Sequence, residues 1–431
     1  GIVARNRPQH VAALAGVLAA GSPAGMIHAA QSARGLAADI AALDLSVVLA
    51  DAHDWSPEAF TAARDTGTAA IAIGDGPDAA SVEILLLQDG RQKRRRDHAV
   101  EFLSSGTTGA PKRVPLGWRT VEKAIAEAGE AYAGTDADET QVVVHPVGSI
   151  AGLAYTLPSL IHGRPLVILD RFEPQSWARA IRDHRVTRGT VPPAGIGMVL
   201  DSDVPAAWLE SLTLVAVGGG KLDPHQQDSF EARFGVPILP AFGATEFAGV
   251  VANWSLELYR EWGQGKRGSA GRASKGVRLR TVDPVGCSIL APGEIGLLEA
   301  QVDRLGADWI RTTDLASIDG DGFLFLHGRT DEAINRGGFK VLPAAICSVL
   351  RQHPAVADAA VVARPDRRLG EVPAAAVELR PGHTASARSL LDFAREQLLA
   401  YQVPVEIRIL ASLPRNPSLK VSLPDVKALL A

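Results

Sequence analysis

The sequence predicts an α/β protein with a large N-terminal domain of α/β layers, a β-rich subdomain within it, and a small, mobile α+β domain at the C-terminus. Short apolar runs of strand length alternate with segments of helical spacing through the first part of the chain. Two predicted strands lead into glycine-bearing segments, and short strands and turns prevail after Lys266. This alternation favours a largely parallel, buried sheet.

The first elements follow the alternating pattern. Gln9–Ala20 has the apolar spacing of a helix, and Val47–Ala50 is a short run typical of a buried strand. A helix is predicted to start at Ser56, because this capping hydroxyl is followed by a proline and then by an acidic residue. The next strand and helix are predicted at Ala69–Ile73 and Thr120–Ala133.

The middle of the chain continues this pattern and places two glycine-bearing segments after strands. The predicted elements are the strand Pro165–Leu169, the helix Gln175–His184, the strand Leu212–Val217, the helix from Asp223 to Phe234 and the strand Val236–Pro240. Gly218-Gly219-Gly220 and Phe242-Gly243-Ala244-Thr245-Glu246 follow the last two strands. Open α/β sheets bind ligands at the carboxyl ends of their strands, so we predict a shared crevice there.

The large domain is predicted to span residues 1–330, with the β-rich subdomain at about 266–330. Val277–Val282 alternates apolar and basic residues, as a half-buried strand does, and Glu294–Glu299 is a second strand. The turn Asp319–Gly322 links two extended runs, which predicts a hairpin.

The small α+β domain is predicted to span residues 331–431, which is close to the typical size of a domain. Its predicted elements are the helix Ala344–Gln352, the strands Ala357–Ala363 and Ala374–Leu379, the helix Ser386–Leu398 and the strand Glu406–Leu410.

Composition places the chain among ordinary globular proteins. Of its 431 residues, 46% are hydrophobic and 21% are charged, and the net charge of −4 gives no general reason to expect a nucleic-acid or membrane partner. In the basic run Arg91–Arg96, a solvated linker is favoured over a nucleic-acid patch. Cys287 and Cys347 lack CxxC spacing, so neither a disulfide framework nor a zinc site is indicated. We find no signal peptide or transmembrane run and expect a soluble, cytoplasmic protein.

A loop rich in hydrogen-bond donors follows the strand-like run Ala99–Leu103. Ser104-Ser105-Gly106-Thr107-Thr108-Gly109-Ala110-Pro111-Lys112 combines four hydroxyls, two glycines and a lysine. Glycines let backbone N–H groups approach an anion, and the hydroxyls and the ammonium add donors, so the loop favours phosphate binding over a plain polar hairpin. It is not a Walker A loop, because a proline precedes Lys112 and an extended run follows it.

This string resembles the phosphate loop of the adenylate-forming enzymes, which include acyl- and aryl-CoA synthetases. Matching motifs occur in the family's order from Gly1 to Lys420. Family members usually begin some tens of residues further upstream, so the chain is expected to be either natively short or trimmed. The resemblance implies that ATP is bound by Ser104, Ser105, Gly106, Thr107, Thr108, Gly109 and Lys112, and by Gly218, Gly219 and Gly220.

The segment Phe242–Glu246 resembles the family's aromatic-glycine-x-threonine-glutamate signature. The resemblance implies that Phe242 stacks on adenine, with Gly243 beside it, that Thr245 contacts phosphate and that Glu246 holds Mg²⁺. The family usually has tyrosine where Phe242 stands, so stacking is kept while a hydroxyl contact is lost. A capped loop with a solvated acid is the structural alternative for this motif taken alone.

Two further motifs imply contacts with the ribose and a hinge between the domains. Trp309–Leu315 resembles the tyrosine-arginine-threonine-glycine-aspartate element, in which Asp314 would accept both ribose hydroxyls. Gly328–Asp331 resembles the hinge segment, in which Arg329 would contact ribose or phosphate and Asp331 would be the pivot. In isolation, a domain linker with a surface ion pair fits these last two residues nearly as well.

The last motifs imply a CoA channel and the catalytic lysine. Asn335–Pro343 resembles the segment that lines the pantetheine channel of CoA ligases, with Gly337, Gly338, Phe339 and Lys340 at the channel and Ala345 in place of the usual glutamate. Leu413–Val421 resembles the loop of the catalytic lysine. Lys420 matches that lysine, and Leu419 replaces the usual preceding glycine. With Lys420, Thr245 and Glu246 would form the catalytic group.

The acyl-pocket motif departs from the family pattern. In Pro146–Leu153, Gly148 stands where the family has an aromatic residue and Ser149 where it has histidine. No aspartate occupies the position that binds the amine in amino-acid-activating domains. This pattern disfavours an amino acid and suggests a widened pocket for a bulky carboxylic acid.

The resemblance implies an AMP-forming acid–CoA ligase that uses ATP, Mg²⁺ and CoA. The acid would first become acyl-AMP, and the small domain would then rotate about Asp331 so that CoA could attack. An acyl-AMP ligase that loads a carrier protein is the nearest alternative, and a non-catalytic nucleotide- or acyl-binding paralogue is an alternative of another class. A nucleic-acid binder is weakest, because it depends on Arg91–Arg96 alone. The acid and the oligomeric state stay open.

Overall fold

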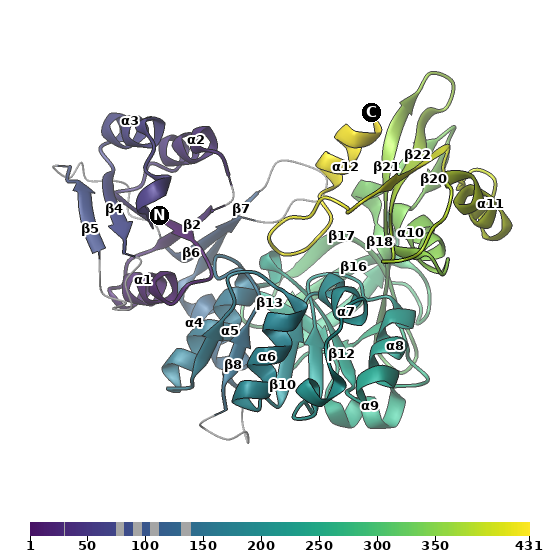
Figure 1. Ribbon diagram of the computed structural model, residues 1–431, viewed down its shortest axis with the longest axis horizontal. Coiled ribbons are helices and arrows are strands. Elements are labelled where there is room, and N and C mark those ends of the chain that lie inside the picture. Colours follow the sequence, from purple (N-terminus) through teal and green to yellow (C-terminus); the bar gives the residue numbers. More distant parts are fainter. Residues whose placement is uncertain (30, 75–81, 89–96, 104–111, 131–138) are drawn as a thin grey trace. The chain divides into compact units, whose positions relative to one another are not determined.

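The computed structural model describes residues 1–29, 31–74, 82–88, 97–103, 112–130 and 139–431. One compact unit contains the described residues up to Thr190 together with Ala244–Gly249, and a second contains Val191–Gly243 and Val250–Ala431. Each unit combines helices with sheets (Figure 1), and the predicted α/β fold class is confirmed. The boundary near residue 331 stays a prediction, since the second unit runs through it.

The first unit is built on a seven-stranded sheet with the strand order β5-β4-β3-β1-β2-β6-β7. The inner strands pair in parallel, and the edge strands β5 and β7 pair antiparallel with their neighbours. The predicted, largely parallel sheet is therefore present. Its strands are β1 (Ile2–Ala4), β2 (Ala24–His28), β3 (Val47–Asp51), β4 (Ala69–Ile73), β5 (Val82–Leu86), β6 (His98–Leu103) and β7 (Arg113–Gly117).

Three helices accompany this sheet: α1 (Pro8–Ala19), α2 (Ala33–Leu43) and α3 (Pro57–Thr66). The start of α3 follows the predicted capping rule, because the Ser56 hydroxyl accepts the Ala59 N–H at 3.2 Å. Apolar side chains of α2 and α3 are buried with those of the strands in one core. This burial explains why segments with short, alanine-rich sequences form stable helices here.

The rest of the first unit contains α4 (Trp118–Glu130), β8 (Gln141–Val143), α5 (Ile150–Ile161), β9 (Leu166–Ile168), α6 (Pro174–His184) and β10 (Arg188–Val191). β8 and β9 pair in parallel. The predicted helix Thr120–Ala133 is α4 as far as Glu130, and its remainder lies outside the described residues. α5 was not predicted; its first residues belong to the predicted acyl-pocket motif Pro146–Leu153.

In the second unit, strands follow the order β11-β12-β13-β14-β18-β17-β16-β15. β11 and β12 pair in parallel. The pairs β13–β14, β14–β18, β18–β17, β17–β16 and β16–β15 are antiparallel. The elements are α7 (Pro193–Leu200), β11 (Leu214–Val217), α8 (Pro224–Phe234), β12 (Ile238–Ala244), β13 (Gly249–Asn253), α9 (Leu256–Trp262), β14 (Ser269–Ala273), β15 (Val277–Val282), β16 (Gly296–Val302), β17 (Trp309–Ile318) and β18 (Phe323–Arg329).

Two predicted boundaries were wrong in this part of the chain. β12 does not end at Pro240 but continues through Ala244, because Phe242 packs against a buried cluster that includes Leu298. The strand predicted at Glu294–Glu299 begins only at Gly296, since Glu294 closes a turn in which its N–H donates to the Ala291 carbonyl at 3.1 Å.

The C-terminal part of the second unit forms a five-stranded sheet in which β20, β19, β22 and β21 are neighbours in this order and β23 pairs with β22. Its elements are β19 (Ile334–Arg336), β20 (Phe339–Val341), α10 (Pro343–Arg351), β21 (Val356–Asp366), β22 (Gly370–Leu379), α11 (Ala387–Gln397), β23 (Glu406–Leu410) and α12 (Leu423–Leu430). β21 and β22 are longer than predicted because they form one hairpin, whose turn is held by the Asp366 carboxylate.

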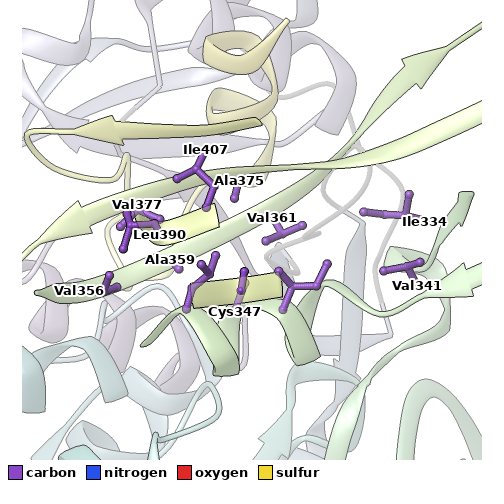
Figure 2. Packing of buried hydrophobic residues seen from close by; sticks show 13 residues of the cluster. Ile334, Val341, Cys347, Val356, Ala359, Val361, Ala375, Val377, Leu390 and Ile407 are labelled. Atoms are coloured by element: carbon purple, nitrogen blue, oxygen red, sulfur yellow. The ribbon is translucent and has the colours of Figure 1, made fainter. Parts of the chain in front are cut away.

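Side chains of this sheet and of α10 and α11 form one buried core (Figure 2). Cys347 on α10 lies within it, beside residues such as Leu390 and Val361. Burial raises the pKa of its thiol to about 11, so Cys347 behaves as a small apolar residue at neutral pH. Within the described ranges, no helix is long and apolar enough to cross a membrane.

A half-buried carboxylate holds the start of β12, the strand that leads into the aromatic-glycine motif. Glu231 on α8 accepts the Ile238 N–H at 2.9 Å, the Tyr259 hydroxyl at 2.8 Å and the Gln227 amide at 3.1 Å. Arg267 donates to both of its oxygens. Burial raises the pKa of Glu231, but these four partners outweigh burial and hold the pKa below its usual value.

We expect the Glu231→Gln substitution to lower the free energy of unfolding by about 1–3 kcal/mol at pH 7, because an amide cannot satisfy the same donors. A carboxyl whose pKa is lowered by folding stabilises the protein above its unfolded pKa, and this contribution disappears as the pH falls through the folded pKa. Urea unfolding at pH 7 and at decreasing pH should therefore show the difference from the parent protein shrinking. Glu210→Gln, at an exposed position, is the control; an equal loss there would contradict the assignment.

Candidate functional site

The glycine-rich segment after β11 lies beside Lys420. β11 ends at Val217, and Gly219 has a φ of +87°, in the region that favours glycine. A Cβ atom at position 219 would lie 3.8 Å from Cε of Lys420. The structure thus brings together two predicted site segments, Gly218–Gly220 and the C-terminal lysine, that are far apart in the sequence.

Another contact joins the same parts of the second unit. Arg380, which follows β22, lies with Nη1 at 3.3 Å from Oδ1 of Asp201 at the end of α7. α10 also packs against β18. The C-terminal sheet therefore contacts the rest of the second unit through Arg380 and through α10, in addition to the loop that carries Lys420.

Lys420 is presented by a short loop that is closed by hydrogen bonds. Arg415 and Val421 form an isolated antiparallel bridge, and the Asn416 N–H donates to the Lys420 carbonyl at 2.8 Å. The side-chain oxygen of Asn416 accepts two backbone N–H groups, those of Ser418 and Lys420, each at 3.0 Å. One asparagine side chain therefore orients the backbone through the whole turn.

Leu419, the residue before the lysine, has a left-handed backbone conformation with a φ of +59°. Leucine is uncommon in this region, because its Cβ approaches the following carbonyl oxygen. The family pattern has glycine at this position, and glycine adopts the conformation without strain. Leu419 therefore holds a conformation that glycine would adopt without strain.

Asp314 and Arg329 come from different sequence motifs, and the hairpin of β17 and β18 makes them direct neighbours. They are paired across the two strands, and Nη1 of Arg329 lies 3.8 Å from Oδ1 of Asp314. The Asp314 side chain is 18% exposed, so its carboxylate is partly shielded yet reachable. The two predicted nucleotide-binding residues therefore lie in one place.

Asp331 lies in a single turn of 3₁₀ helix, η4 (Thr330–Glu332), directly after β18. Its two carboxylate oxygens accept hydrogen bonds from Arg329, at 2.9 Å from Nε and 2.8 Å from Nη2. Burial raises the pKa of Asp331, but the guanidinium holds it below its usual value. The Arg329–Asp331 ion pair, which is also expected if this segment is only a domain linker, is therefore present. The role of Asp331 as a pivot stays a prediction.

The aromatic-glycine motif is divided between the two compact units. Phe242 and Gly243 lie on β12 and belong to the second unit, and Phe242 is half-buried against an apolar cluster. Thr245 and Glu246 belong to the first unit, where they begin the 3₁₀ turn η3 (Thr245–Phe247). Glu246 is exposed, so its carboxylate is accessible to a cation.

Among the described residues, one group of three potential metal ligands occurs, Asp51, His53 and Asp54, with ligand atoms within 4.8 Å of one another. Arg5 already pairs with both carboxylates, at 3.0 Å from Asp51 and 2.6 Å from Asp54. This arrangement is an ion-pair network rather than a metal site. Glu246 is a single carboxylate, which suits Mg²⁺, because this ion is commonly held by one or two carboxylates together with phosphate oxygens.

The predicted CoA-channel residues form the hairpin of β19 and β20. Gly337 and Gly338 occupy its two-residue turn with φ values of +58° and +91°, which explains why both positions are glycine. The Gly337 N–H donates to the Leu369 carbonyl at 2.8 Å. Phe339 is 57% exposed and stacks on Tyr401 with ring centroids 4.7 Å apart, and Lys340 is exposed as well.

The acyl-pocket motif forms the start of α5. The Ser149 hydroxyl accepts the Gly152 N–H at 3.1 Å and donates to the Pro146 carbonyl at 2.7 Å, so it caps the helix. A Cβ atom at Gly148 would lie 3.1 Å from Cβ of Ala4. Close packing against Ala4 therefore favours glycine at position 148, independently of the predicted widening of the pocket.

Sequence reasoning missed a polar cluster beside this motif. Nε2 of His145 lies 3.2 Å from Oγ1 of Thr190, which in turn lies 3.2 Å from the hydroxyl of Tyr155. The rings of His145 and Tyr155 are stacked with centroids 5.3 Å apart. The sequence contains a slight signal for this cluster: His145 directly precedes the motif Pro146–Leu153, in which Ser149 stands where the family has histidine.

Most of the predicted phosphate loop lies outside the described residues. The predictions for Ser104, Ser105, Gly106, Thr107, Thr108 and Gly109, like the linker predicted at Arg91–Arg96, concern positions that the structure does not describe. Lys112 is described, is exposed, and directly precedes β7.

Two protein-family models match successive parts of the chain. A family model described as AMP-binding enzyme matches residues 1–301, and a model described as AMP-binding enzyme C-terminal domain matches residues 346–420. The chain is 31% identical over 352 residues to peroxisomal OPC-8:0-CoA ligase 1 of Arabidopsis thaliana, a match that covers 77% of the chain. It spans 64% of the length of that relative.

Two further matches extend this picture. The chain is 31% identical over 349 residues to indoleacetate–CoA ligase of Aromatoleum aromaticum, which covers 76% of the chain and 66% of the relative. A solved structure of O-succinylbenzoate coenzyme A synthetase from Bacillus subtilis, in complex with ATP and magnesium ion, has a TM-score of 0.76 at 23% identity, covering 98% of this chain and 87% of the other. The structural match supports the fold.

We expect Leu419→Gly to raise the free energy of unfolding by about 0.5–1 kcal/mol. Relief of the left-handed strain contributes about 1–2 kcal/mol, and the greater freedom of glycine in the unfolded chain offsets about 0.5–1 kcal/mol of this. Urea unfolding measures the difference. Leu399→Gly, at an exposed leucine that is not among the residues with positive φ, is the matched control and should lower stability. A loss at both positions would argue against strain at Leu419.

Proposed function

The chain belongs to the AMP-binding enzyme family, and on this premise we propose that it is an AMP-forming acid–CoA ligase. It would convert a carboxylic acid and ATP into acyl-AMP and pyrophosphate, and then transfer the acyl group to CoA. The observation that carries the proposal is the position of Lys420 beside Gly218–Gly220, because it places a cation at the glycine-bearing end of a parallel strand.

The first step needs a cation near the α-phosphate. A carboxylate is a poor electrophile, since its leaving group would be oxide, and joining it to AMP creates a good leaving group. The carboxylate oxygen attacks the α-phosphorus, the bond to the bridging oxygen breaks, and pyrophosphate leaves with that electron pair. Fixed positive charge stabilises the negative charge that develops on the phosphoryl oxygens. Lys420 supplies this charge in our proposal.

The nucleoside of ATP would be held by residues of the β17–β18 hairpin and of β12. Asp314 would accept hydrogen bonds from the ribose hydroxyls, and Arg329, which is paired with it across the hairpin, would contact ribose or phosphate. Phe242 would stack on adenine beside Gly243. The loop from Ser104 to Lys112 would hold the β- and γ-phosphates as pyrophosphate forms.

Glu246 would hold Mg²⁺, with Thr245 beside it contacting phosphate. The exposure of Glu246 and the chemistry of a single carboxylate support this assignment. When bound, the ion would neutralise charge on the phosphate oxygens. In the solved synthetase structure that the chain resembles, ATP and magnesium are bound together.

The second step would use the hairpin of β19 and β20. The small domain would rotate about Asp331, withdraw Lys420 and bring Gly337 and Gly338 to the pantetheine arm, with Phe339 and Lys340 at the channel. The thiolate of CoA would attack the acyl carbon, and AMP would leave with its phosphate oxygen. The exposure of the turn and of Phe339 supports access for a large thiol.

The acid is proposed to be a carboxylic acid other than an amino acid, and bulky. Support comes from the acyl-pocket motif, which lacks an aspartate for an amine, and from relatives named for OPC-8:0 and indoleacetate. Gly148 and Ser149 would border the acyl group at the start of α5. Because Ala4 lies against Gly148, the width of the pocket depends on other side chains as well.

Release of AMP and pyrophosphate with a panel of acids, each with and without CoA, tests the proposed reaction. We expect AMP to appear only when acid and CoA are both supplied. Acyl-adenylate that accumulates and ignores CoA would instead favour an acyl-AMP ligase that loads a carrier protein. No turnover and no nucleotide exchange with any acid would favour a non-catalytic paralogue.

Lys420→Ala should reduce adenylation by about 100-fold or more while largely sparing thioester formation from preformed acyl-AMP, because its charge acts only in the first step. Pyrophosphate exchange and single-turnover thioester assays measure the two steps separately. Lys427→Ala, which removes an exposed lysine on α12, is the matched control. Equal loss of both steps with Lys420→Ala would contradict the assigned role.

A further inference from the structure

We infer that Arg415 is a positioning residue for Lys420: it ties the strained lysine loop to the buried core of the C-terminal sheet. The inference rests on the proposed function, because it concerns the step in which Lys420 acts. Arg415 is separated from Lys420 by the turn and need not touch substrate to exert this effect.

Arg415 bridges the loop and the sheet with one guanidinium. Its Nη1 donates to the carbonyl of Leu419 at 3.1 Å, and its Nη2 donates to Oδ2 of Asp358 at 2.7 Å. Glu378 lies 3.6 Å from the same Nη2 and accepts the Leu413 N–H at 2.8 Å. A planar, forked donor can hold two acceptors in fixed directions, which an ammonium cannot do.

Asp358 is a rigid anchor for this arginine. It lies on β21, and its Oδ1 accepts from Nε of Arg351 and from the Ala359 N–H, each at 2.8 Å. Arg351 is the last residue of α10, a helix that packs on the buried core of the sheet. Burial raises the pKa of Asp358, but Arg351 and Arg415 outweigh burial and hold it below its usual value, so the carboxylate stays charged at neutral pH.

The loop needs such an anchor because of the conformation of Leu419. A leucine with a φ of +59° is drawn toward the extended or right-handed regions, and either change would redirect the peptide that leads into Lys420. The Leu419 carbonyl is the acceptor that Arg415 holds. Asn416 fixes the N–H groups of the turn, and Arg415 fixes this carbonyl, so the two side chains act on complementary backbone groups.

The test compares the two half-reactions in single variants of the full chain. We expect Arg415→Ala to reduce the rate of adenylation by about 10- to 100-fold, the scale on which small displacements of a catalytic group act. Thioester formation from preformed acyl-AMP should stay within about twofold, since Lys420 takes no part in it. Arg364→Ala, which breaks the Arg364–Glu406 ion pair elsewhere on the sheet, is the matched control and should alter neither step.

A second variant tests the role of strain. Introducing Leu419→Gly into Arg415→Ala should recover at least about threefold in adenylation, because glycine adopts the left-handed conformation without help. If Arg415→Ala does not fold, Arg415→Lys carries the same comparison, since it keeps the charge and loses the fork.

Three outcomes would overturn the inference: unchanged adenylation, equal loss of both half-reactions, or a selective loss that Leu419→Gly does not relieve. The last would mean that Arg415 acts through its charge rather than by positioning. Failure of the proposed function is distinguishable, because the parent chain itself would then show no adenylation with any acid, whereas adenylation that survives Lys420→Ala would reject only the role of that lysine. Loss in Lys420→Ala without loss in Arg415→Ala would reject only the positioning role.

Discussion

The proposed chemistry depends on one backbone constraint, the left-handed turn at Leu419 that directs Lys420. The turn is held by two side chains: Asn416 accepts the N–H groups of Ser418 and Lys420, and Arg415 donates to the carbonyl of Leu419. Neither contact is strong alone, since a single hydrogen bond contributes about 1 kcal/mol. Together they offset the strain of a leucine in this region, and they allow a flexible lysine to lie beside Gly219.

Partly buried carboxylates paired with arginine hold the backbone at two places in the second unit. Glu231 joins α8, β12 and α9 through Ile238, Tyr259 and Arg267, and Asp358 joins the lysine loop to the sheet core. In each case burial disfavours the charge and several donors restore it, so the pKa of the carboxyl falls. Removing a single partner from such a group is costly, because it leaves a partly buried charge incompletely satisfied.

Several residues of the predicted site motifs are also needed for the local structure. This structural need accounts for the departures from the family pattern at Gly148 and Ser149. Gly337 and Gly338 are required by the hairpin turn, whatever passes along the proposed channel. Ser149 caps α5, and Gly148 meets Ala4. Asp331 binds Arg329 with both oxygens, so a rotation about this residue would have to keep or break that ion pair.

The sequence by itself determined the α/β class, many of the helices and strands, and the order of the motifs, because apolar spacing and capping residues act locally. It could not show that β12 continues through Phe242, since that strand is extended by packing against a distant cluster. Nor could it pair Asp314 with Arg329, join Lys420 to Gly219, or reveal Arg415 and the His145–Thr190 contact. These are contacts between segments distant in the chain, and strand register, burial and loop closure decide them only when the chain is folded.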